Sequence, residues 1–404
     1  MMQEEKWLIA VTAGRWQKHG IREAKAAGIK ILAIDSDPTA EGFAEADKSL
    51  CIDFSDHDKI ISELKGMNII FNGAVSFCSE AGMMLAAKIR EVFELPGLKP
   101  ELCERLLDKA VQRSVWTKAG VPGPASWKVF HSITEALTGI DKLKIPFILK
   151  PIDSSGSRGV TKIESTTDDI TDAINRAFHF SRSNQVIAES YMDGTEFTVE
   201  VFVVKGEVNV LAVTEKKKVE GTRGTVAREL ATPDRPKEIL DKIKQAVISA
   251  FTSLNYTEGP GHAEIILLKD NSVGLVEVAG RGGGFMVFDK LVPSASGVNI
   301  ARLTAMQSVG LPVGQMDIKE AAVVLRFFPS KPGVLESISG FNVANLIKGV
   351  ESAPFVEVGD KFDRATADGD RLGYILTKAA TPAEAQCLAN EAESKIFFDI
   401  KNIQ

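Results

Sequence analysis

Two apolar runs, residues 261–268 and 273–278, flank a short polar segment. This pattern predicts a β-hairpin, and a turn centred between positions 270 and 271 places Glu264 directly opposite Glu277. Two carboxylates that face each other on one side of a sheet repel and weaken the strand pair. A divalent cation between them removes this repulsion, because Mg²⁺ takes carboxylate oxygens together with substrate phosphates. The alternative is a different register with both side chains in water.

The segment after this hairpin, residues 279–285, is rich in glycine and contains Arg281. Glycines allow the backbone to approach a ligand closely, and the guanidinium fork of Arg281 suits an anionic group. A flexible loop with a solvated arginine is the alternative. His262 lies two residues before Glu264, so both side chains point to the same face of the strand. His262 lines a ligand site or is a packed, neutral histidine, and both interpretations stay open.

A lysine, Lys150, ends the apolar strand predicted over residues 146–150, and a loop of serines and glycines follows it. Backbone N–H groups of Gly156, Ser157 and Gly159 can point at phosphate oxygens. The loop is not of the Walker A type, because no Gly-Lys-Ser/Thr sequence ends it. A mobile hairpin turn is the alternative interpretation.

Three further charged residues have two interpretations each. A helical stretch is predicted over 101–119, and Asp108-Lys109 opens the part of it that ends at Gly120. Lys109 is a surface lysine or a second lysine for phosphate. Glu189 lies in an otherwise apolar strand and needs a donor, such as the amino group of adenine or a nearby lysine. A structural salt bridge is the competing role. Glu80, before a predicted helix, holds an amine or is an ordinary carboxylate favoured by the helix dipole.

The chain divides into parts of different character. Strand and helix signals alternate before residue 95, which predicts a doubly wound parallel sheet. The breaker-rich segment 95–100 marks a boundary. Short strands that look antiparallel dominate the middle of the chain. The tail holds more strands and a last helix over 382–396, with Thr381 as its N-cap.

Composition excludes several classes of protein. The 404 residues carry 48 basic and 54 acidic side chains, a net charge of −6, which argues against a nucleic-acid partner. No apolar run approaches the roughly 18 residues of a membrane helix, and no signal peptide is evident. The four cysteines are scattered, as expected for reduced thiols. We therefore expect a cytoplasmic protein with small-molecule substrates and no membrane partner.

The order of these motifs resembles the ATP-grasp superfamily over roughly residues 5–310. The sequence contains Asp-Lys at 108–109, Gly-Val-Pro at 120–122, Phe-Ile-Leu-Lys-Pro at 147–151, Glu-x-x-x-x-Gly-x-Glu at 189–196, and then the hairpin with Arg-Gly-Gly. The tail, with Gly369–Tyr374 and Thr381–Ala385, is similar to the C-terminal domain of biotin carboxylase-like members. The most similar subgroup is the carboxylate–amine ligases, which include L-amino acid ligases.

The resemblance implies a fold of the α/β and α+β class and three domains. Residues 1–98 would form a Rossmann-like pre-ATP-grasp domain with a doubly wound parallel sheet. Residues 99–310 would form the ATP-grasp domain of two α+β lobes, with a lid subdomain over about 122–193. Residues 311–404 would form a C-terminal α+β domain, and a homodimer is expected.

The resemblance also assigns roles to single residues. ATP and Mg²⁺ are the implied cofactors, and Mn²⁺ is an alternative metal. Lys109 and Lys150 would contact phosphates, with Gly156, Ser157 and Gly159 as the lid over them. Glu189 and the backbone near Met192 would hold adenine, and Glu196 would hold ribose. Glu264 and Glu277 would bind the metal, and Arg281, Lys150 and His262 would act at the reacting groups.

The implied reaction is ATP-dependent ligation of a carboxylate to an amine through an acylphosphate, with release of ADP and phosphate. Many members have Asn two residues after the second metal-binding Glu, but this chain has Ala279. The substitution keeps a non-catalytic ATP-binding regulator as an alternative, and a bicarbonate-using carboxylase or carbamoyl-phosphate-type enzyme is another. In the family, the segment 216–234 borders the substrate cavity. Its basic residues, including Arg223, would attract an acidic substrate or belong to a solvated loop.

Overall fold

A computed structural model describes residues 5–140, 143–154, 156–165, 168–222 and 226–402. Its N-terminal part is a four-stranded sheet in the order β3-β2-β1-β4, and every strand pair in it is parallel. The strands are β1 (Trp7–Val11), β2 (Lys30–Asp35), β3 (Lys48–Cys51) and β4 (Phe71–Val75), and the helices between and after them are α1 (Lys18–Ala26), α2 (His57–Gly66) and α3 (Met83–Val92). The predicted doubly wound sheet is confirmed.

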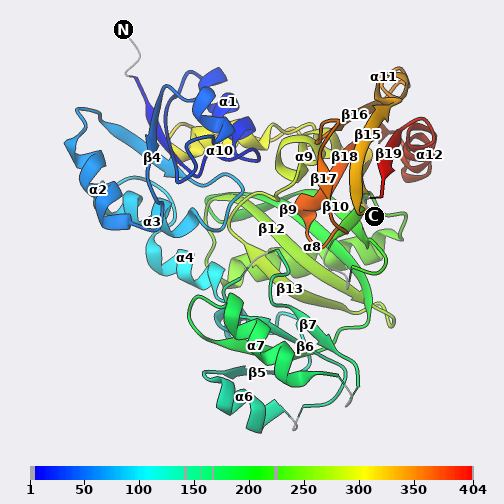
Figure 1. The fold of residues 1–404 in the computed structure, drawn as a ribbon. Coiled ribbons are helices and arrows are strands. Elements are labelled where there is room, and N and C mark those ends of the chain that lie inside the picture. Colours follow the sequence, from blue (N-terminus) through cyan, green and yellow to red (C-terminus); the bar gives the residue numbers. More distant parts are fainter. Residues whose placement is uncertain (1–4, 141–142, 155, 166–167, 223–225, 403–404) are drawn as a thin grey trace.

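Strand β1 shows why this sheet carries layers on both faces. Leu8 and Ala10 belong to one buried apolar cluster, whereas Ile9 and Val11 belong to another. Alternate side chains of a strand point to opposite faces, so a continuously apolar strand needs cover on each side. The strand order reverses between β1 and β4, and the loops after these two strands leave the same edge of the sheet (Figure 1). Such an edge is where open α/β sheets bind ligands.

A second four-stranded sheet, antiparallel and in the order β5-β8-β6-β7, lies at the lower end of the molecule in Figure 1. Its elements are β5 (Trp127–Phe130), α6 (Ile133–Gly139), β6 (Phe147–Pro151), β7 (Thr161–Ile163), α7 (Ile170–Phe180) and β8 (Val186–Ser190). Leu149 and Ala188 pack with the two helices. Their neighbours Lys150 and Glu189 therefore point to the other face of this sheet.

The largest sheet has eight strands in the order β13-β12-β9-β10-β11-β14-β18-β16. Its strands are β9 (Gly194–Val204), β10 (Glu207–Lys218), β11 (Ala227–Ala231), β12 (Gly259–Leu268), β13 (Val273–Ala279), β14 (Ala322–Pro329), β16 (Val350–Pro354) and β18 (Arg371–Ala379). Strands from the last quarter of the chain thus extend the sheet of the middle part. The predicted divisions at residues 98 and 310 stay predictions.

Helices cover both faces of this sheet. Helices α8 (Lys237–Ser253) and α12 (Pro382–Glu393) pack on one face. The π-helix η3 (Val287–Leu291), α9 (Val292–Ser296) and α10 (Ile300–Ser308) lie on the other, between the large sheet and the N-terminal sheet. The predicted N-cap is confirmed, because Thr381 accepts from Glu384 N and Glu384 accepts from Thr381 N.

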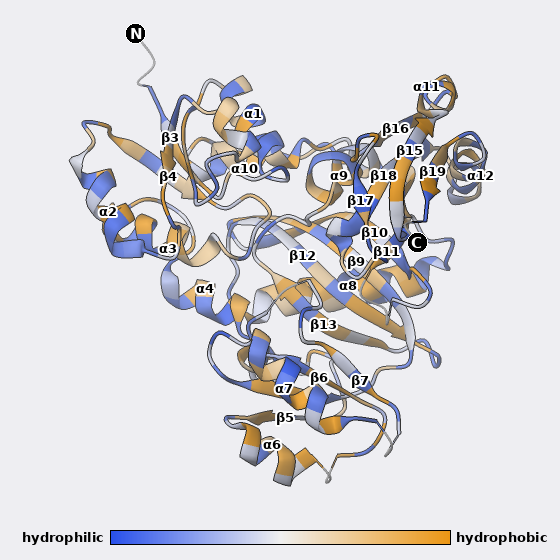
Figure 2. Cartoon of the chain, in the orientation of Figure 1, coloured by the Kyte–Doolittle hydropathy of each residue, from blue (hydrophilic) through white to orange (hydrophobic). Residues whose placement is uncertain are grey.

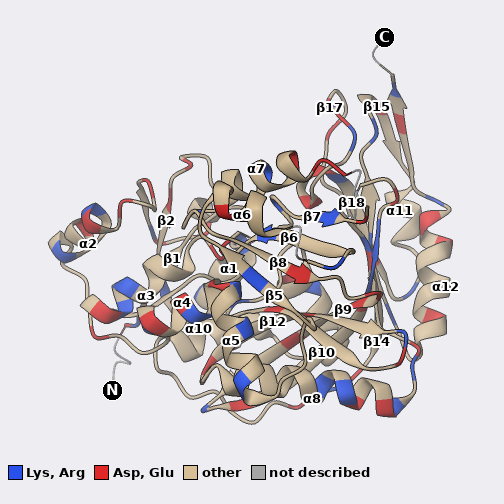
Figure 3. Cartoon of the chain, turned by 90° about the horizontal axis from the view of Figure 1, so that it is seen from below, with Lys and Arg blue, Asp and Glu red and all other residues tan. Residues whose placement is uncertain are grey.

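The remaining C-terminal elements form a small sheet in the order β17-β15-β19. They are β15 (Gly333–Ser339), α11 (Phe341–Ala344), β17 (Lys361–Phe362) and β19 (Phe397–Lys401), and two short 3₁₀ turns elsewhere are η1 (Glu41–Ala44) and η4 (Asp368–Asp370). Figure 2 shows hydrophobic residues along the strands and a mixture of both kinds on the helices. Figure 3 shows both signs of charge on α2 and α8. Within the described ranges, every helix is too short or too polar to cross a bilayer.

The helical stretch predicted over 101–119 is confirmed but is interrupted at Asp108, and the predicted opening of a helix at Asp108-Lys109 is confirmed as well. The structure has two helices there, α4 (Pro100–Leu107) and α5 (Lys109–Ala119), and Asp108 has extended backbone between them. The Asp108 carboxylate accepts hydrogen bonds from the backbone N–H groups of Ala110 at 2.7 Å and Val111 at 3.0 Å. An aspartate that caps a new helix competes with continuation of the preceding one. The break makes Lys109 the first residue of α5.

Candidate active site

The predicted pairing of the two glutamates is confirmed, although the turn differs from the prediction. Glu264 on β12 lies opposite Glu277 on β13. Leu267 pairs with Val273, so the turn is centred on Asp270, and a register shift after Glu264 restores the expected alignment. The two side chains are 23% and 21% exposed, and thus remain accessible from the face of the sheet.

Lys216, near the end of β10, links two carboxylates of the same face. Its Nζ lies 2.8 Å from Glu196 Oε1 and 3.0 Å from Glu264 Oε1. Burial alone lowers the pKa of Lys216, but the two carboxylates outweigh burial and raise the pKa well above its ordinary value. The pKa of Glu264 is correspondingly held well below its usual range, against the opposing effect of burial. Lys218 pairs with the second oxygen of Glu196.

The loop predicted at the start of segment 216–234 is wrong for Lys216, Lys217 and Lys218, which lie on a strand, although Lys217 is exposed to solvent. Strand β10 runs to Lys218, and Lys216 is paired and largely covered. Arg223 lies outside the described residues. The position of Lys216 on a strand was the sequence feature that could have placed it in the site. Alternation along the strand puts Lys216 on the same face as Thr214, and the Thr214 hydroxyl forms a hydrogen bond with the Thr198 hydroxyl on β9.

Lys109 joins the glutamate pair from α5. Its Nζ lies 2.8 Å from Glu277 Oε2 and donates to the carbonyl oxygen of Ser154 at 2.9 Å. Only 7% of the residue is exposed, so the surface-lysine interpretation is wrong. Burial opposes the charged form, but Glu277 and Glu80 more than offset it and raise the pKa of Lys109. The backbone N–H of Lys109 also donates to Ile152, which ties α5 to the loop after β6.

Lys150 and Glu189 form a second buried group with Arg113. Glu189 accepts from Arg113 Nε at 2.7 Å, and its other oxygen lies 2.7 Å from Lys150 Nζ. The two cations overcome the effect of burial and lower the pKa of Glu189 to about 2. Burial prevails at Lys150 and lowers its pKa. The structure therefore has the salt bridge that was one of the two interpretations of Glu189.

Sequence analysis missed Arg113, although a signal was present. It lies four residues after Lys109, and residues at this spacing share one face of a helix. Arg113 also donates to the carbonyl of Val276, and Gln112 exchanges hydrogen bonds with the backbone of Val278. Helix α5 is thereby attached to β13 beside Glu277.

Arg281 lies where the N-terminal sheet meets the glycine segment. Its guanidinium group pairs with Glu80, from the loop after β4, and donates to the carbonyl of Gly282 at 2.9 Å. Gly282 N donates to Phe77 in the same loop at 3.0 Å. Burial disfavours both charges, yet the pair lowers the pKa of Glu80 and raises that of Arg281. Glu80 is therefore an ion-pair partner of Arg281, in addition to its place before α3.

His262 is held by a carboxylate that sequence analysis did not identify. Its Nδ1 contacts Glu200 on β9, and its Nε2 lies 4.0 Å from Glu264 Oε1, on the predicted face. The other oxygen of Glu200 accepts from Gly283 N at 3.2 Å. Burial alone lowers the pKa of His262, but Glu200 overcomes it and raises the pKa to about 9. The ring is therefore protonated at neutral pH, and the packed, neutral interpretation is wrong.

The loop after β6 and the segment after β8 provide the remaining predicted residues. Gly156, Ser157 and Gly159 all have positive φ, at 66°, 57° and 72°. This turn lies beyond Ser154, whose carbonyl Lys109 holds. Met192 packs over β13, since a Cβ placed on Gly274 would lie 2.3 Å from its sulfur. The turn, in the sequence that follows β6, therefore lies close to Lys109, and Met192 lies against β13, the strand that carries Glu277.

The donors present suit a metal that is shared with a phosphate. Within the described part of the chain, no group of three or more His, Cys, Asp or Glu side chains is arranged as a metal cage. Glu264 and Glu277 alone face each other, and Mg²⁺ is commonly held by one or two carboxylates plus substrate phosphates. Ala279 lies opposite His262 and offers no side-chain ligand. The two glutamates thus fit a phosphate-bound magnesium ion.

Comparisons with known proteins agree with this geometry. Residues 143–289 match the family model of the ATP-grasp domain, and residues 326–401 match that of L-amino acid ligase C-terminal domain 2. The chain is 26% identical over 398 residues to the uncharacterized protein y4rH of Sinorhizobium fredii, covering 96% of this chain and 81% of the relative. It is 30% identical over 197 residues to D-alanine--D-alanine ligase of Bordetella avium, covering 47% of this chain and 60% of the ligase.

A solved structure extends the likeness to the whole fold. The L-amino acid ligase from Bacillus licheniformis superposes with a TM-score of 0.84 at 21% identity, covering 99% of this chain and all of that one. The matched ATP-grasp segment contains Lys150, Glu189, Glu264 and Glu277. Residues 143–289 therefore match the ATP-grasp domain, and residues 326–401 match the C-terminal domain 2 of L-amino acid ligases.

Proposed function

We propose that the protein is an ATP-dependent carboxylate–amine ligase that forms an amide or peptide bond through an acylphosphate and releases ADP and phosphate. The observation that carries the proposal is the contact of Lys109 with Glu277, one of the facing pair Glu264 and Glu277, with Lys150 close enough for the charges of Glu277 and Lys109 to act on its pKa. A triphosphate and a magnesium ion present the complementary charges. The ATP-grasp match and the likeness to ligases support the same activity.

Each proposed phosphate contact replaces an ion pair in the structure. Lys109 would exchange Glu277 for phosphate oxygens, and Lys150 would do the same with Glu189. Glu264 and Glu277 would hold Mg²⁺, which when bound neutralises phosphate charge. Lysine suits such exchange because its ammonium group is a compact charge on a flexible stem.

The nucleoside would lie between the second sheet and β13. Glu189 and the backbone near Met192 would hold adenine, while Glu196 would accept from the ribose hydroxyls. In the structure, Glu196 is paired with Lys216 and Lys218. The turn with Gly156, Ser157 and Gly159 would cover the phosphates. Covering them excludes water, which would otherwise hydrolyse an acylphosphate.

The chemistry begins with attack of a substrate carboxylate oxygen on the γ-phosphorus. The bond to the β,γ-bridging oxygen breaks and ADP leaves. An amine then attacks the acyl carbon, and inorganic phosphate leaves as the amide forms. Phosphoryl transfer needs alignment and charge stabilisation more than covalent help, so Lys150 and Arg281 would act by stabilising negative charge. His262, protonated through Glu200, would act as a cation rather than as a base.

A phosphate-release assay with magnesium and ATP tests the proposal. The purified chain is screened with single amino acids, amino acid pairs and other carboxylates combined with amines. Release that needs both a carboxylate and an amine, together with a product of the summed mass less one water, supports ligation. Release with bicarbonate alone indicates the carboxylase alternative. ATP binding without any release indicates a regulator, the alternative raised by Ala279.

The remaining predictions belong to the same proposal. The domains are placed at 1–98, 99–310 and 311–404, with the lid subdomain at about 122–193. We also propose a homodimer in the cytoplasm. Cys51, Cys78, Cys103 and Cys387 are all free thiols, as in a reducing compartment. Light scattering of the purified chain tests the dimer.

A further inference from the structure

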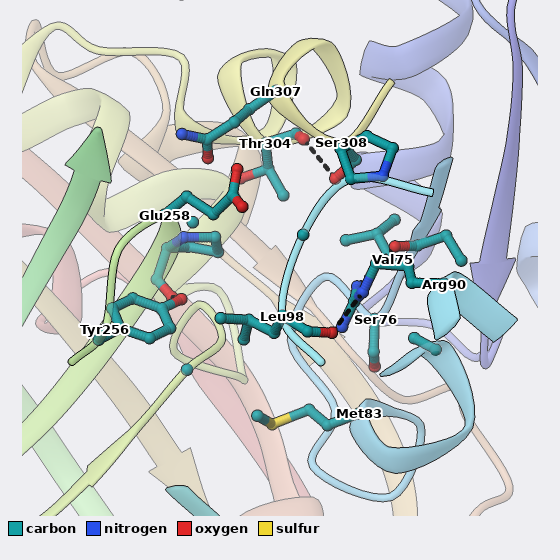
Figure 4. Close-up of a pocket in the computed structure, with 17 residues that line it drawn as sticks. Val75, Ser76, Met83, Arg90, Leu98, Tyr256, Glu258, Thr304, Gln307 and Ser308 are labelled. Carbon is teal, nitrogen blue, oxygen red and sulfur yellow. Dashed lines mark hydrogen bonds between the residues drawn. The ribbon is translucent and has the colours of Figure 1, made fainter. Parts of the chain in front are cut away.

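A small cavity lies where the N-terminal sheet meets the rest of the chain, and Gly280, next to Arg281, is one of the residues that line it (Figure 4). Its volume is about 50 Å³, and it lies between β4, α3, the segment 96–98, the segment 256–260 and α10. Gly97 approaches Arg90 closely, since a Cβ there would lie 2.8 Å from Arg90 Cδ. The cavity therefore lies where residues 74–98 meet residues 256–260, Gly280 and residues 304–308.

Arg90, on α3, contributes a buried positive charge to the cavity wall. It is 8% exposed, its Nε donates to Leu98 O at 2.9 Å, and its Nη1 donates to Ala74 O at 2.7 Å. A guanidinium group has five N–H donors, so N–H groups of Arg90 remain that make neither of these two hydrogen bonds. Among the described residues, the hydrogen bonds that Arg90 donates go to the backbone carbonyls of Leu98 and Ala74, and it forms no ion pair with a carboxylate. A buried charge without a counter-charge is costly, and burial accordingly lowers the pKa of Arg90.

The other polar groups of the wall have partners of their own. Ser76 Oγ donates to Ser79 O at 2.6 Å, and Ser308 Oγ donates to Thr304 O at 2.7 Å. Gln307 Nε2 donates to Val203 O at 3.0 Å. The guanidinium group of Arg90 is thus the one cationic group among the residues that line the cavity.

One acidic group also borders the cavity. Figure 4 shows Glu258 and Arg90 on opposite sides of the cavity, with the segment that carries Leu98 between them. Glu258 raises the pKa of Arg90 through space, although burial dominates. A ligand in the cavity therefore faces the positive charge of Arg90 and the negative charge of Glu258, and the repulsion by Glu258 is stronger for a divalent anion than for a monovalent one.

We propose that this cavity binds one small monovalent anion, a halide or a carboxylate group, against the guanidinium group of Arg90. Its size suits a few heavy atoms, because one water needs about 10–15 Å³ by the same measure. The bound anion supplies the counter-charge that Arg90 lacks. It joins α3, the segment 96–98 and α10, so its binding stabilises the folded chain by linkage.

Bromide is the probe for a direct test. Crystals of the full chain are soaked in sodium bromide and measured at the bromine absorption edge. The proposal expects an anomalous peak within hydrogen-bond distance of Arg90. A well-ordered cavity without such a peak, or with peaks only at exposed arginines, overturns it.

Thermal unfolding provides the test in solution. Increasing bromide at constant sodium concentration should raise the unfolding midpoint of the wild type more than that of Arg90→Met. Arg302→Met, a change at an exposed residue of α10, is the matched control and should keep the wild-type response. Equal bromide responses in Arg90→Met and the wild type contradict the proposal.

A second variant keeps the proposal testable if Arg90→Met does not fold. Glu258→Gln removes the opposing charge and keeps the side-chain shape. It should lower the half-saturating bromide concentration by about threefold or more, because repulsion across a partly buried site is lost. It should also let sulfate compete with bromide. An unchanged bromide response in Glu258→Gln is evidence against an anion facing both groups.

Discussion

The large sheet carries two networks of buried charge that begin at successive residues of β10. The site network comprises Lys216, Glu196, Glu264, Glu277 and Lys109. The helix network comprises Lys217, Glu229, Arg326, Glu393 and Arg228, and it attaches α12 to β11 and β14. Because adjacent strand residues point to opposite faces, Lys216 and Lys217 serve different networks although they are neighbours.

The two networks differ in the type of side chain that chiefly pairs with their carboxylates: arginine in the helix network and lysine in the site network. Arg326 contacts Glu229 at 2.6 Å and Glu393 at 2.6 Å, and the exposed fractions of Arg326 and Glu229 are 6% and 5%. Lysines hold the site network, and its two facing glutamates stay more than 20% exposed. The planar arginine fork favours fixed geometry, whereas lysine is a mobile point charge. The ion pairs of the helix network therefore have fixed geometry, whereas the lysines of the site network can exchange their carboxylate partners for a ligand.

The largest expected effect is a loss of activity on substitution of one of the two facing glutamates, which tests whether the site network, and not the helix network, is needed for activity. Glu277→Gln should reduce substrate-dependent ADP release by about 10³-fold or more, because it removes one of two proposed metal ligands and the partner of Lys109. Glu229→Gln, the matched change in the helix network, should reduce stability and leave the specific activity of the folded protein nearly unchanged. Steady-state ADP release measures both. Full activity in Glu277→Gln would refute the metal assignment.

The second effect concerns stability in the helix network. Arg326→Met should lower the free energy of unfolding by about 4 kcal/mol, because it leaves the buried Glu229 without its main partner. Denaturant unfolding at pH 7 measures the loss, and nucleotide affinity of the folded fraction should change little. A loss of ATP binding at full stability would mean that the two networks are coupled.

The sequence predicts those parts of this comparison that depend on local pattern. Alternation along a strand is a short-range rule, so the facing of Glu264 and Glu277 was predictable even though the bulge after Glu264 was not. The apolar strands of the first sheet and the Thr381 cap follow from similar rules. The bounds of β4, Phe71–Val75, are harder to predict, because its Asn-Gly-Ala sequence interrupts the apolar pattern of a buried strand.

Long-range pairing explains what the sequence could not provide. Nothing local indicates that Glu189 meets Arg113, 76 residues away, or that Glu80 meets Arg281, 201 residues away. The same holds for Glu200, which looks like any polar residue of a strand until His262 is placed beside it. Family resemblance supplied the roles of the site residues, whereas folding decides their ion-pair partners.

The third effect uses pH to test whether Glu189 belongs with the fixed or the exchangeable pairs. Its pKa is lowered from 4.5 to about 2, so the resulting stability is fully present above pH 4.5 and is lost as the pH falls through 2. The shift corresponds to about 3 kcal/mol. Glu189→Gln should be less stable than the wild type by about this amount at pH 7, and the gap should close towards pH 2.

Acid unfolding of both proteins measures this gap. Glu320→Gln is the control, because Glu320 is 79% exposed and its pair with Lys244 is long, at 3.4 Å. That variant should follow the wild-type profile at every pH. A gap between Glu189→Gln and the wild type that stays constant down to pH 2 would exclude the charged form of Glu189 as its source.

The smallest expected effect is the difference in turnover between variants of the adjacent residues Lys216 and Lys217. Lys216→Met should lower the turnover number by about 10²-fold, because the buried cation that joins Glu196 to Glu264 is lost while an apolar stem of similar length remains. Lys217→Met should leave turnover within about twofold and cost no more than about 1 kcal/mol, since Lys217 is 57% exposed. Turnover and unfolding are measured on both variants. If Lys217→Met slows turnover as much as Lys216→Met, strand alternation on β10 does not separate a reactive face from a structural one.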